Sequence, residues 1–436
     1  MKAIFKITIT LLLILMSSMQ IQASTIYIGE EEDLTDTTKY NIYTGTVIDA
    51  NDKTPLPFAS IESEGRNIAT VTNIDGEFTL KVPKETKVSS IKISYVGYKN
   101  SVLNIEPYHN ADNKKIALEP SSVNLQAITI RTEDASGLIN DILNNIRQNY
   151  SQKDMMMTAF YRETIKKRKN YVSISEAVVD IYKSPYANDF KYDQVKLIQG
   201  RKSADVEKMD TILFKVQGGP VTSLLLDVAK NPYTLLSEKY QEVYSFTISG
   251  VISINDRLHY VISFNQKPYV SSPFYNGKLY VEMDRLAITE AEFELNMENE
   301  AEVASMFIRK KPAGMTVIPE RAAYRAKNTI ENDTWYFSYA RAEVKFDVDW
   351  DKKLFKTSYL TMSEIAVTDR EDNLAEKFAT KERFKSSQVL DDLVYVFFDQ
   401  GFWGGYNVIE PDQSIESAIK KLNRKYMKTS EDETNP

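Results

Sequence analysis

The sequence of 436 residues contains no cysteine and only two histidines, His109 and His259. Without cysteine the chain cannot form disulfides, thiolate metal sites or iron–sulfur clusters, and it lacks the residue whose lipidation anchors bacterial lipoproteins. Two histidines are too few for a histidine-rich metal site, so we expect each to take an ordinary structural role. The sequence therefore indicates no metal, no cofactor and no recognisable catalytic residue.

Glycine and proline are also scarce, with 15 and 14 residues, whereas tyrosine and phenylalanine number 26 and 19. This balance favours long β-strands with aromatic cross-strand pairs. The formal charge of −7 gives a surface that repels phosphate backbones, so we expect no nucleic-acid partner. The predicted fold class is mainly β, and the length suggests at least two folded units.

The first 23 residues resemble a cleaved signal peptide. Two lysines precede the apolar run Ile7–Met16, and the small residue Ala23 ends the segment. Because the run is shorter than the ~20 residues that span a bilayer, we predict export to the periplasm or association with the outer membrane; an uncleaved anchor is the alternative. The predicted divisions are a signal peptide 1–23, a flexible lead-in 24–40, a β-sandwich 41–119, a linker strand 120–134, a β-rich domain 135–390 and a C-terminal segment 391–436.

Short alternating segments between Ile42 and Glu119 are separated by turn residues, a pattern typical of a β-sandwich. Asp75-Gly76 predicts a tight turn because glycine adopts positive φ without steric cost, and Phe78 then begins a strand with one buried face. The expected strands are Ile42–Asp49, Ala59–Glu62, Ile68–Thr72, Gly76–Val82, Val88–Tyr95 and Lys114–Glu119.

Four ordered segments in this region carry a family resemblance: Thr44–Asp49, Pro55–Ile61, Asp75–Leu80 and Ile93–Tyr98. Together they resemble the carboxypeptidase regulatory-like domain. The resemblance implies a transthyretin-like β-sandwich that serves as an accessory or docking module, and it implies no catalytic residues. The same module precedes the plug of many outer-membrane nutrient receptors, so the expected partner is an envelope protein or an outer-membrane receptor.

The larger domain is expected to begin with an amphipathic helix, since apolar residues recur at helical spacing from Leu138 to Tyr150. Asn255-Asp256 and Asn276-Gly277 have hairpin-turn chemistry, which favours antiparallel strands, and Ser223–Glu238 predicts a helical interruption against the sheet. The expected strands are Tyr171–Tyr182, Thr211–Val216, Tyr244–Ile254, Leu258–Gln266, Lys278–Asp284, Ile288–Met297, Thr334–Tyr339, Ala342–Trp350 and Ser358–Val367.

A helix followed by long antiparallel strands, with the hairpin Tyr275–Asp284 leading into Leu286–Glu290, resembles the open half-barrel of periplasmic lipoprotein carriers. The resemblance implies a curved sheet whose concave, aromatic-rich face accepts an acyl chain or another apolar ligand. The alternative is that the aromatic residues only fill a core. The residues that we expect to line such a concavity are Tyr260, Phe264, Phe293 and Trp335.

Two charge clusters and the C-terminal region complete the predictions. Glu290, Glu292 and Glu294 alternate on one strand and are interpreted as a solvent face. The basic run Lys166–Lys169 is interpreted as a hairpin turn, and contact with lipid headgroups is the alternative for this run. The segment Phe402–Pro411, which contains most of the aromatic run Gly401–Tyr406, is expected to dock a terminal helix, and a functional aromatic loop is the alternative. The residues of that helix are a cap at Ser414 and an apolar stripe of Ile415, Ala418, Ile419, Leu422 and Tyr426.

These features favour a non-enzymatic binding or docking protein of the bacterial envelope, with an apolar ligand or an envelope protein as partner. The alternative is a hydrolase that acts on an envelope polymer or glycan through a pair of carboxylates. An enzyme of that kind needs two carboxylates converging in a cleft, whereas a binding protein needs an apolar surface for its ligand.

Overall fold

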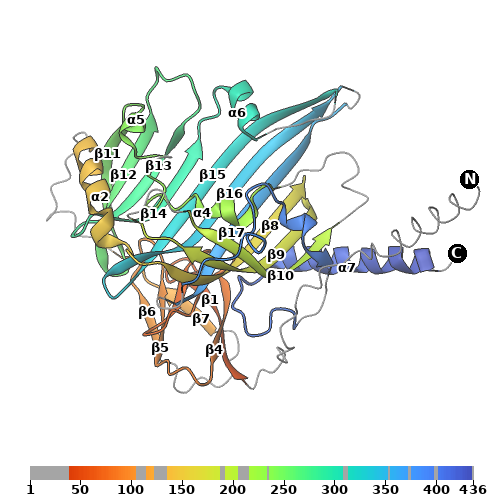
Figure 1. Ribbon diagram of the computed structural model, residues 1–436, viewed down its shortest axis with the longest axis horizontal. Coiled ribbons are helices and arrows are strands. Elements are labelled where there is room, and N and C mark those ends of the chain that lie inside the picture. Colours follow the sequence, from red (N-terminus) through yellow and green to blue (C-terminus); the bar gives the residue numbers. More distant parts are fainter. Residues whose placement is uncertain are drawn as a thin grey trace, which may run out of the picture.

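A computed structural model describes residues 39–104, 114–121, 135–186, 192–204, 216–232, 235–307, 313–351, 354–371, 375–396 and 401–434. Over these residues the protein is mainly β, with a small sandwich followed by a larger antiparallel sheet, and this confirms the predicted fold class (Figure 1). The predicted signal peptide and His109 lie outside the described residues. No helix in the described ranges is long and apolar enough to cross a membrane.

The sandwich consists of two sheets whose strand orders are β4-β1-β7 and β3-β2-β5-β6. All six predicted strands are confirmed, and the short polar strand β6 is an addition because its sequence has no apolar alternation to reveal it. The strands are β1 (Tyr40–Asp49), β2 (Ser60–Ser63), β3 (Ala69–Val71), β4 (Glu77–Pro83), β5 (Ser90–Ser94), β6 (Ser101–Asn104) and β7 (Lys114–Leu118).

The turn before β4 also forms as predicted. Gly76 has a φ of 76°, and a Cβ atom there would lie 2.5 Å from the carbonyl oxygen of Val47, so only glycine fits without a shift of the backbone. Directly after this turn Phe78 enters the sandwich core, where it packs with Leu80 and Ile93.

The larger domain is one open sheet of eleven strands within the described residues, in the order β11-β12-β13-β14-β15-β16-β17-β8-β9-β10-β18. Neighbours are antiparallel except for the short pairing of β10 with β18, which is parallel. The strands are β8 (Met155–Lys167), β9 (Asn170–Lys183), β10 (Gln194–Ala204), β11 (Tyr244–Ile254), β12 (Arg257–Gln266), β13 (Tyr275–Glu282), β14 (Ala287–Leu295), β15 (Met315–Glu331), β16 (Thr334–Trp350), β17 (Thr357–Glu371) and β18 (Tyr395–Val396).

Some predictions within this sheet are wrong. The two strands expected at 334–339 and 342–350 form one continuous strand, β16, and the expected strands did not include β8, β10, β15 or β18. Gly277 lies inside β13 and not in a turn. Glycine is required at this position because a Cβ atom would come within 2.2 Å of the Glu292 carbonyl oxygen on the neighbouring strand. Asn255 and Asp256, in contrast, form the predicted hairpin turn with φ values of 52° and 57°. The strand predicted at 211–216 lies almost wholly outside the described residues.

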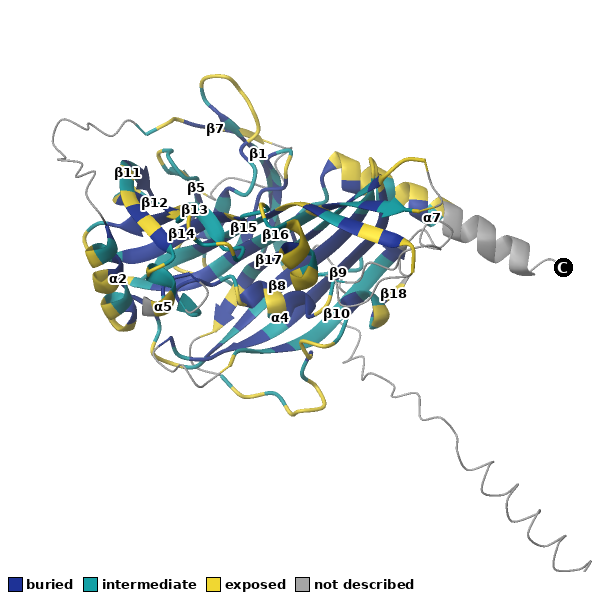
Figure 2. Cartoon of the chain, turned by 90° about the horizontal axis from the view of Figure 1, so that it is seen from above, coloured by how far each residue is buried: buried dark blue, intermediate teal, exposed yellow. Residues whose placement is uncertain are grey.

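The helices are distributed unequally over the two faces of the large sheet. Figures 1 and 2 show α2, α4 and α5 on one face, which we call the helix face, and the sandwich on the other, which we call the sandwich face. Helix α2 confirms the predicted first helix, and α4 and α5 flank the predicted helical interruption. The helical elements are α2 (Ser136–Asn149), α4 (Gly219–Leu224), α5 (Glu238–Gln241), α6 (Glu300–Phe307), the 3-10 turn η4 (Leu390–Asp392) and α7 (Gln413–Thr434).

The terminal helix α7 forms as predicted, but its cap differs. The Asp412 carboxylate accepts the backbone N–H of Ile415 at 2.7 Å and the Ser414 hydroxyl at 2.5 Å, so Asp412 caps the helix and Ser414 supports the cap. The apolar stripe that begins at Ile415 packs against Tyr171 and Ile174 of β9.

The position of Phe78 yields a stability prediction. Its side chain is 3% exposed, so Phe78→Ala should lower the free energy of unfolding by about 3–5 kcal/mol through lost burial and a residual cavity. Ile74→Ala, at an exposed position four residues earlier, is the matched control and should change stability by less than about 0.5 kcal/mol. Urea unfolding combined with hydrogen exchange of the β1 and β4 amides measures both, and equal effects of the two variants would contradict the assigned core.

Candidate binding site

An aromatic cluster lies on the helix face of β11–β14, beneath helix α2 (Figure 1). Tyr244 and Phe264 are buried, with ring centroids 5.5 Å apart, and Phe293 stacks on Tyr324 at 5.2 Å. Rings at these separations attract one another beyond the burial of their area. The cover over this part of the sheet is a helix and the chain segment around α5, since Ala135, Ile139, Ile142, Leu235 and Leu236 complete the cluster.

The structure brings three of the four predicted lining residues together. Phe264 and Phe293 lie in the cluster beneath α2, and Tyr260 packs at its margin. Trp335 is fully buried in a neighbouring cluster, where it meets Ile146 and Tyr150 near the C-terminal end of the same helix. The four aromatic residues therefore lie along α2. Side chains of this helix cover the surface of the sheet on which a ligand was expected.

Helix α2 is hydrogen-bonded to the sheet at both ends. The Tyr150 hydroxyl donates to the carbonyl oxygen of Ile288 at 2.5 Å, and the Asn149 amide donates to that of Arg285 at 2.8 Å. The N-terminal half presents Ile139 and Ile142 to the aromatic cluster. This half is held by burial together with one backbone hydrogen bond, in which the N–H of Ala135 donates to the carbonyl oxygen of Phe246 in β11 at 3.1 Å.

A second group on the helix face consists of carboxylates that the sequence analysis missed. Glu163 of β8 is buried and accepts a hydrogen bond from the Tyr161 hydroxyl at 2.9 Å. Asp391 of η4 accepts hydrogen bonds from Ser173 and Ser175 of β9 at 3.2 and 3.1 Å. Burial raises the pKa of Glu163 to about 8, with a further contribution from the charge of Asp391, so Glu163 is a neutral acid at neutral pH.

These two carboxylates are separate from a hollow at the surface of the large domain. Neither Glu163 nor Asp391 lines the open hollow of about 550 Å³ at the surface between the β12–β13 loop and the start of α6. The carboxylates that do line it, Glu298 and Glu300, lie on the exposed segment after β14. No group of three or more metal-ligating side chains is found in the described part of the chain.

The sandwich face carries a row of charged residues that crosses five adjacent strands. Arg201, Glu176, Arg162, Glu364 and Arg341 are direct cross-strand partners on β10, β9, β8, β17 and β16. The charges alternate along the row, and each neighbouring pair is joined by a contact of 2.8–3.3 Å. We call this set the charged row.

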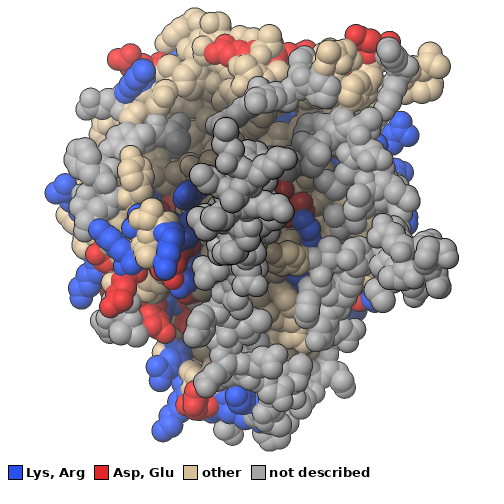
Figure 3. All heavy atoms as spheres, turned by 45° about the vertical axis from the view of Figure 1, so that its right-hand side comes forward, with Lys and Arg blue, Asp and Glu red and all other residues tan. Residues whose placement is uncertain are grey.

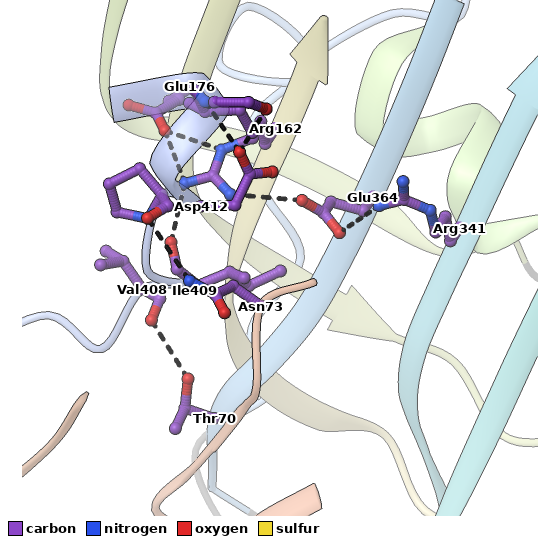
Figure 4. Close-up of polar contacts among 12 residues, drawn as sticks. Thr70, Asn73, Arg162, Glu176, Arg341, Glu364, Val408, Ile409 and Asp412 are labelled. Atoms are coloured by element: carbon purple, nitrogen blue, oxygen red, sulfur yellow. Dashed lines mark hydrogen bonds and ion pairs between the residues drawn. The ribbon is translucent and has the colours of Figure 1, made fainter. Parts of the chain in front are cut away.

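Arg162 is the centre of the charged row. Its side chain is 2% exposed and donates to Glu176 at 2.8 Å, to Glu364 at 3.3 Å and to the backbone carbonyl of Ile409 at 2.7 Å. Burial would raise the pKa of Glu176, but Arg162 and Arg201 outweigh it and hold that pKa below its usual range. Figure 4 shows the guanidinium of Arg162 surrounded by these partners.

The contact to Ile409 links the charged row to the sandwich through the C-terminal segment 401–412. The hydroxyl of Thr70 in β3 donates to the carbonyl oxygen of Val408 at 3.1 Å (Figure 4). The side chain of Asn407 exchanges two hydrogen bonds with the backbone of Lys81 in β4, at 2.7 and 3.0 Å. The segment thus lies between the sandwich and the large sheet and bonds to both.

The aromatic residues of this segment therefore dock the sandwich and not the terminal helix, which corrects the prediction. Trp403 packs edge-on against Phe160 of β8, with centroids 5.4 Å apart, in a cluster that also contains Val71 of the sandwich. The terminal helix α7 packs instead against Tyr171 and Ile174 of β9. Which of these contacts forms depends on the tertiary structure and could not be predicted from the sequence of the segment.

Phe58 makes the most direct contact between the sandwich and the sheet. Its ring stacks on Tyr339 at 5.7 Å and lies 4.9 Å from the guanidinium of Arg341, while its carbonyl oxygen accepts a hydrogen bond from Lys327 at 2.8 Å. Phe58 has a φ of 63°, which is strained for an aromatic residue. Such strain persists only where surrounding contacts fix the residue, as these do.

The acidic strand β14 is only partly a solvent face. Glu294 is exposed as predicted, but Glu290 is buried between the sheet and the sandwich, where Lys327 lies 3.9 Å away. The prediction is wrong for Glu290 because the sandwich covers that part of the strand. Elsewhere on the described surface acidic and basic side chains lie side by side, as Figure 3 shows for one face.

The geometry of the first domain can now be compared with known proteins. Residues 43–130 match the family model of the CarboxypepD_reg-like domain. This confirms the resemblance predicted for 41–119 and identifies the sandwich. No curated protein matches the chain significantly.

Three solved structures show distant likeness to the chain. A DUF1329 family protein from Desulfovibrio piger is 10% identical with a TM-score of 0.24, and the match covers 56% of this chain and 96% of that one. A LolA superfamily protein from Nitrosomonas europaea is 12% identical with a TM-score of 0.19, covering 56% and 98%. Lipovitellin is 11% identical with a TM-score of 0.24, covering 58% and 28%. TM-scores this low carry no argument about the fold or the ligand of this chain.

The charged row predicts a large cost for the loss of its central residue. Arg162→Met should lower the free energy of unfolding by about 3–5 kcal/mol, because it leaves Glu176 and Glu364 with less compensation in a buried setting. Arg321→Met is the matched control, since Arg321 pairs with Glu294 at the surface and should contribute less than about 1 kcal/mol. Chemical denaturation measures both, and comparable losses would contradict the central role of Arg162.

Glu163 predicts a pH dependence of stability. Its folded pKa of about 8 lies above the ordinary value of 4.5, so between these values the folded state holds a proton that the unfolded state has released. This contribution to stability is complete below pH 4.5 and is lost by about 1.4 kcal/mol for each pH unit as the pH rises towards 8.

Glu163→Gln keeps a neutral side chain at all pH values and should remove this loss, so that the variant gains stability relative to the natural chain as the pH rises from 5 to 8. Urea denaturation across that range measures the difference. Exposed Glu300→Gln is the control for removal of one charge. A constant difference between the Glu163 variant and the natural chain would show that Glu163 is ionised in the folded protein.

Proposed function

We propose that this chain is a non-enzymatic binding protein of the bacterial envelope that holds an apolar ligand on the helix face of its large sheet, beneath helix α2. The observation that carries the proposal is the aromatic cluster of β11–β14, which is covered by one amphipathic helix and a short chain segment. A cover of this kind can be displaced without breaking any strand pairing. The sandwich lies on the opposite face and leaves this cover unobstructed.

The energetics of burial support an acyl chain as the ligand. Each CH₂ group that leaves water contributes ~0.8 kcal/mol, so a chain of about twelve carbons contributes roughly 10 kcal/mol. Displacing Ile139 and Ile142 from the cluster costs roughly 1.5–3 kcal/mol for each side chain. A long apolar chain therefore outweighs the two residues that it replaces, whereas a short one does not.

The sandwich supplies the docking part of the proposed function. It is fixed to the sheet by Phe58 and by the C-terminal segment, and also beside β6, where the backbone N–H of Gly97 donates to the carbonyl oxygen of Ser253 in β11 at 3.1 Å. We propose that this module positions the protein against an envelope partner, in the role that the CarboxypepD_reg-like resemblance implies. We propose that the signal peptide predicted at 1–23 exports the protein to that compartment.

A cross-link that holds α2 in place tests ligand entry. The Gln241 amide of α5 donates to Asn140 of α2 at 3.0 Å at the surface, and α5 leads directly into β11. Asn140→Cys together with Gln241→Cys provides the only two thiols in the chain, and a short bis-maleimide can join them. The joined protein should bind a fluorescent fatty acid at least about tenfold more weakly than the unjoined double variant, because Ile139 and Ile142 cannot leave the cluster.

Lys99→Cys with Glu119→Cys is the matched control, since this exposed pair lies 2.9 Å apart in the sandwich and its cross-link should leave binding unchanged. Binding to the natural chain should show a negative heat-capacity change, as expected for apolar burial. Equal affinity of the joined and unjoined α2 variants would place the ligand elsewhere. No binding by the natural chain, together with no co-purifying lipid in native mass spectra, would remove the proposed ligand.

A further inference from the structure

Two large apolar side chains stand in solvent at the end of the β16–β17 hairpin. Leu354 is 94% exposed and Phe355 is 76% exposed. Figure 1 shows β15, β16 and β17 extending to the upper right, away from the sandwich at the bottom of the picture. A leucine and a phenylalanine side by side at the tip of the longest strands contribute nothing to a core, so their exposure needs another explanation.

Basic residues flank this tip on the side of β8 and β9. The β8–β9 turn lies against the start of β17, because the backbone N–H of Arg168 donates to the carbonyl oxygen of Ser358 at 2.7 Å. Arg168 and Lys169 are exposed in that turn, and exposed Lys356 immediately precedes β17. The run Lys166–Lys169 is thus the predicted hairpin turn, placed next to the apolar pair.

Acidic residues near the tip lie on its other side. Asp351 is exposed at the end of β16 and lies beside Gly314, which precedes β15. A Cβ atom added at Gly314 would be 3.1 Å from the Asp351 carboxylate. Asp347 and Asp349 are half-buried further along β16. Among the described residues at this tip, the cations lie towards β8 and the carboxylates towards β15.

Further exposed apolar side chains lie on the same rim of the sheet. In an antiparallel sheet every second turn falls on one rim, and the strand order puts the β12–β13, β14–β15, β16–β17 and β8–β9 connections together. Tyr269 in the first connection is 77% exposed and Met306 in the second is 50% exposed. The rim opposite to the β15–β16 turn thus presents apolar groups on three successive connections.

We propose that this rim is a membrane-docking surface, in which Leu354 and Phe355 insert into a bilayer and the Arg168, Lys169 and Lys356 side chains contact anionic headgroups. Apolar side chains with adjacent cations are the combination that binds the interface of an anionic membrane. The long stems of lysine and arginine can lie along the apolar region while their charges reach the headgroups. A protruding tip suits a fluid bilayer, which closes around it, better than a rigid protein surface, which would need a matching groove.

This surface is separate from the aromatic cluster and helix α2, so the proposal does not depend on the proposed ligand. If both hold, the membrane is also the source or destination of the apolar ligand. Membrane docking at the rim and ligand entry beneath α2 are tested by different variants and different probes. Either proposal can therefore be contradicted while the other holds.

Flotation with lipid vesicles tests the proposal on the full chain. The natural protein should float with vesicles of phosphatidylcholine containing about one quarter phosphatidylglycerol, and should bind pure phosphatidylcholine several-fold more weakly. Leu354→Ser with Phe355→Ser should reduce binding to the anionic vesicles by at least about tenfold, because it removes the inserted groups. Arg168→Gln with Lys169→Gln should reduce binding about fivefold or more and should weaken its dependence on salt.

Tyr192→Ser is the matched control, since Tyr192 is 81% exposed and precedes β10 at the opposite rim. This variant should bind like the natural protein. As a direct readout, Phe355→Trp should show a blue-shifted emission with vesicles and quenching by brominated lipid. All of these substitutions are at exposed positions, so circular dichroism should confirm unchanged folding.

Several results would overturn the proposal. They are no flotation of the natural protein with anionic vesicles, equal binding by the Leu354–Phe355 double variant, or no quenching of Trp at position 355. If the double variant instead changes the sedimentation behaviour of the protein without vesicles, the tip is a contact between copies of the chain. If it abolishes capture of a purified envelope protein while vesicle binding is unchanged, the tip is a protein-docking site.

Discussion

The structure depends on the buried guanidinium of Arg162. A charge removed from water is tolerated only when its hydrogen-bonding capacity is met, and here Glu176, Glu364 and the Ile409 carbonyl meet it from three separate parts of the chain. Because the partners lie on neighbouring strands, the charged row also fixes their register. A slip by one residue would carry every charge to the helix face, into apolar surroundings.

The same interaction determines where the sandwich is held. The Ile409 carbonyl belongs to the C-terminal segment, and that segment bonds to the sandwich at Thr70 and Lys81. Phe58 adds a direct contact over Tyr339 and Arg341. One face of the large sheet is therefore occupied by a polar, specifically bonded interface, and the aromatic cluster is left to the other face, where helices cover it.

Whether a buried ionisable group stays charged depends on the charges beside it. On the sandwich face opposite charges are paired, so Glu176 stays ionised although it is buried. On the helix face, burial raises the pKa of Glu163 to about 8 and keeps it neutral at neutral pH, whereas buried Lys183 of β9 stays charged because it is paired with two carboxylates. His259 of β12 follows the same rule, since burial lowers its pKa to about 4. The physical reason is that desolvation penalises a charge unless another charge compensates it.

The sequence by itself determined the elements whose signal is local. Alternation revealed the sandwich strands, helical spacing revealed α2, and Asn255-Asp256 revealed a hairpin turn, because each pattern needs only residues within one element. Burial that depends on distant segments could not be predicted in this way. Arg162 and Glu364 are 202 positions apart, Glu290 is covered by a domain that precedes it, and Gly277 is required by the approach of Glu292. Tertiary structure alone decided that three of the predicted aromatic residues lie beneath one helix. The pairing of β11–β14 and the position of α2 over these strands both depend on contacts between segments that are far apart in the chain.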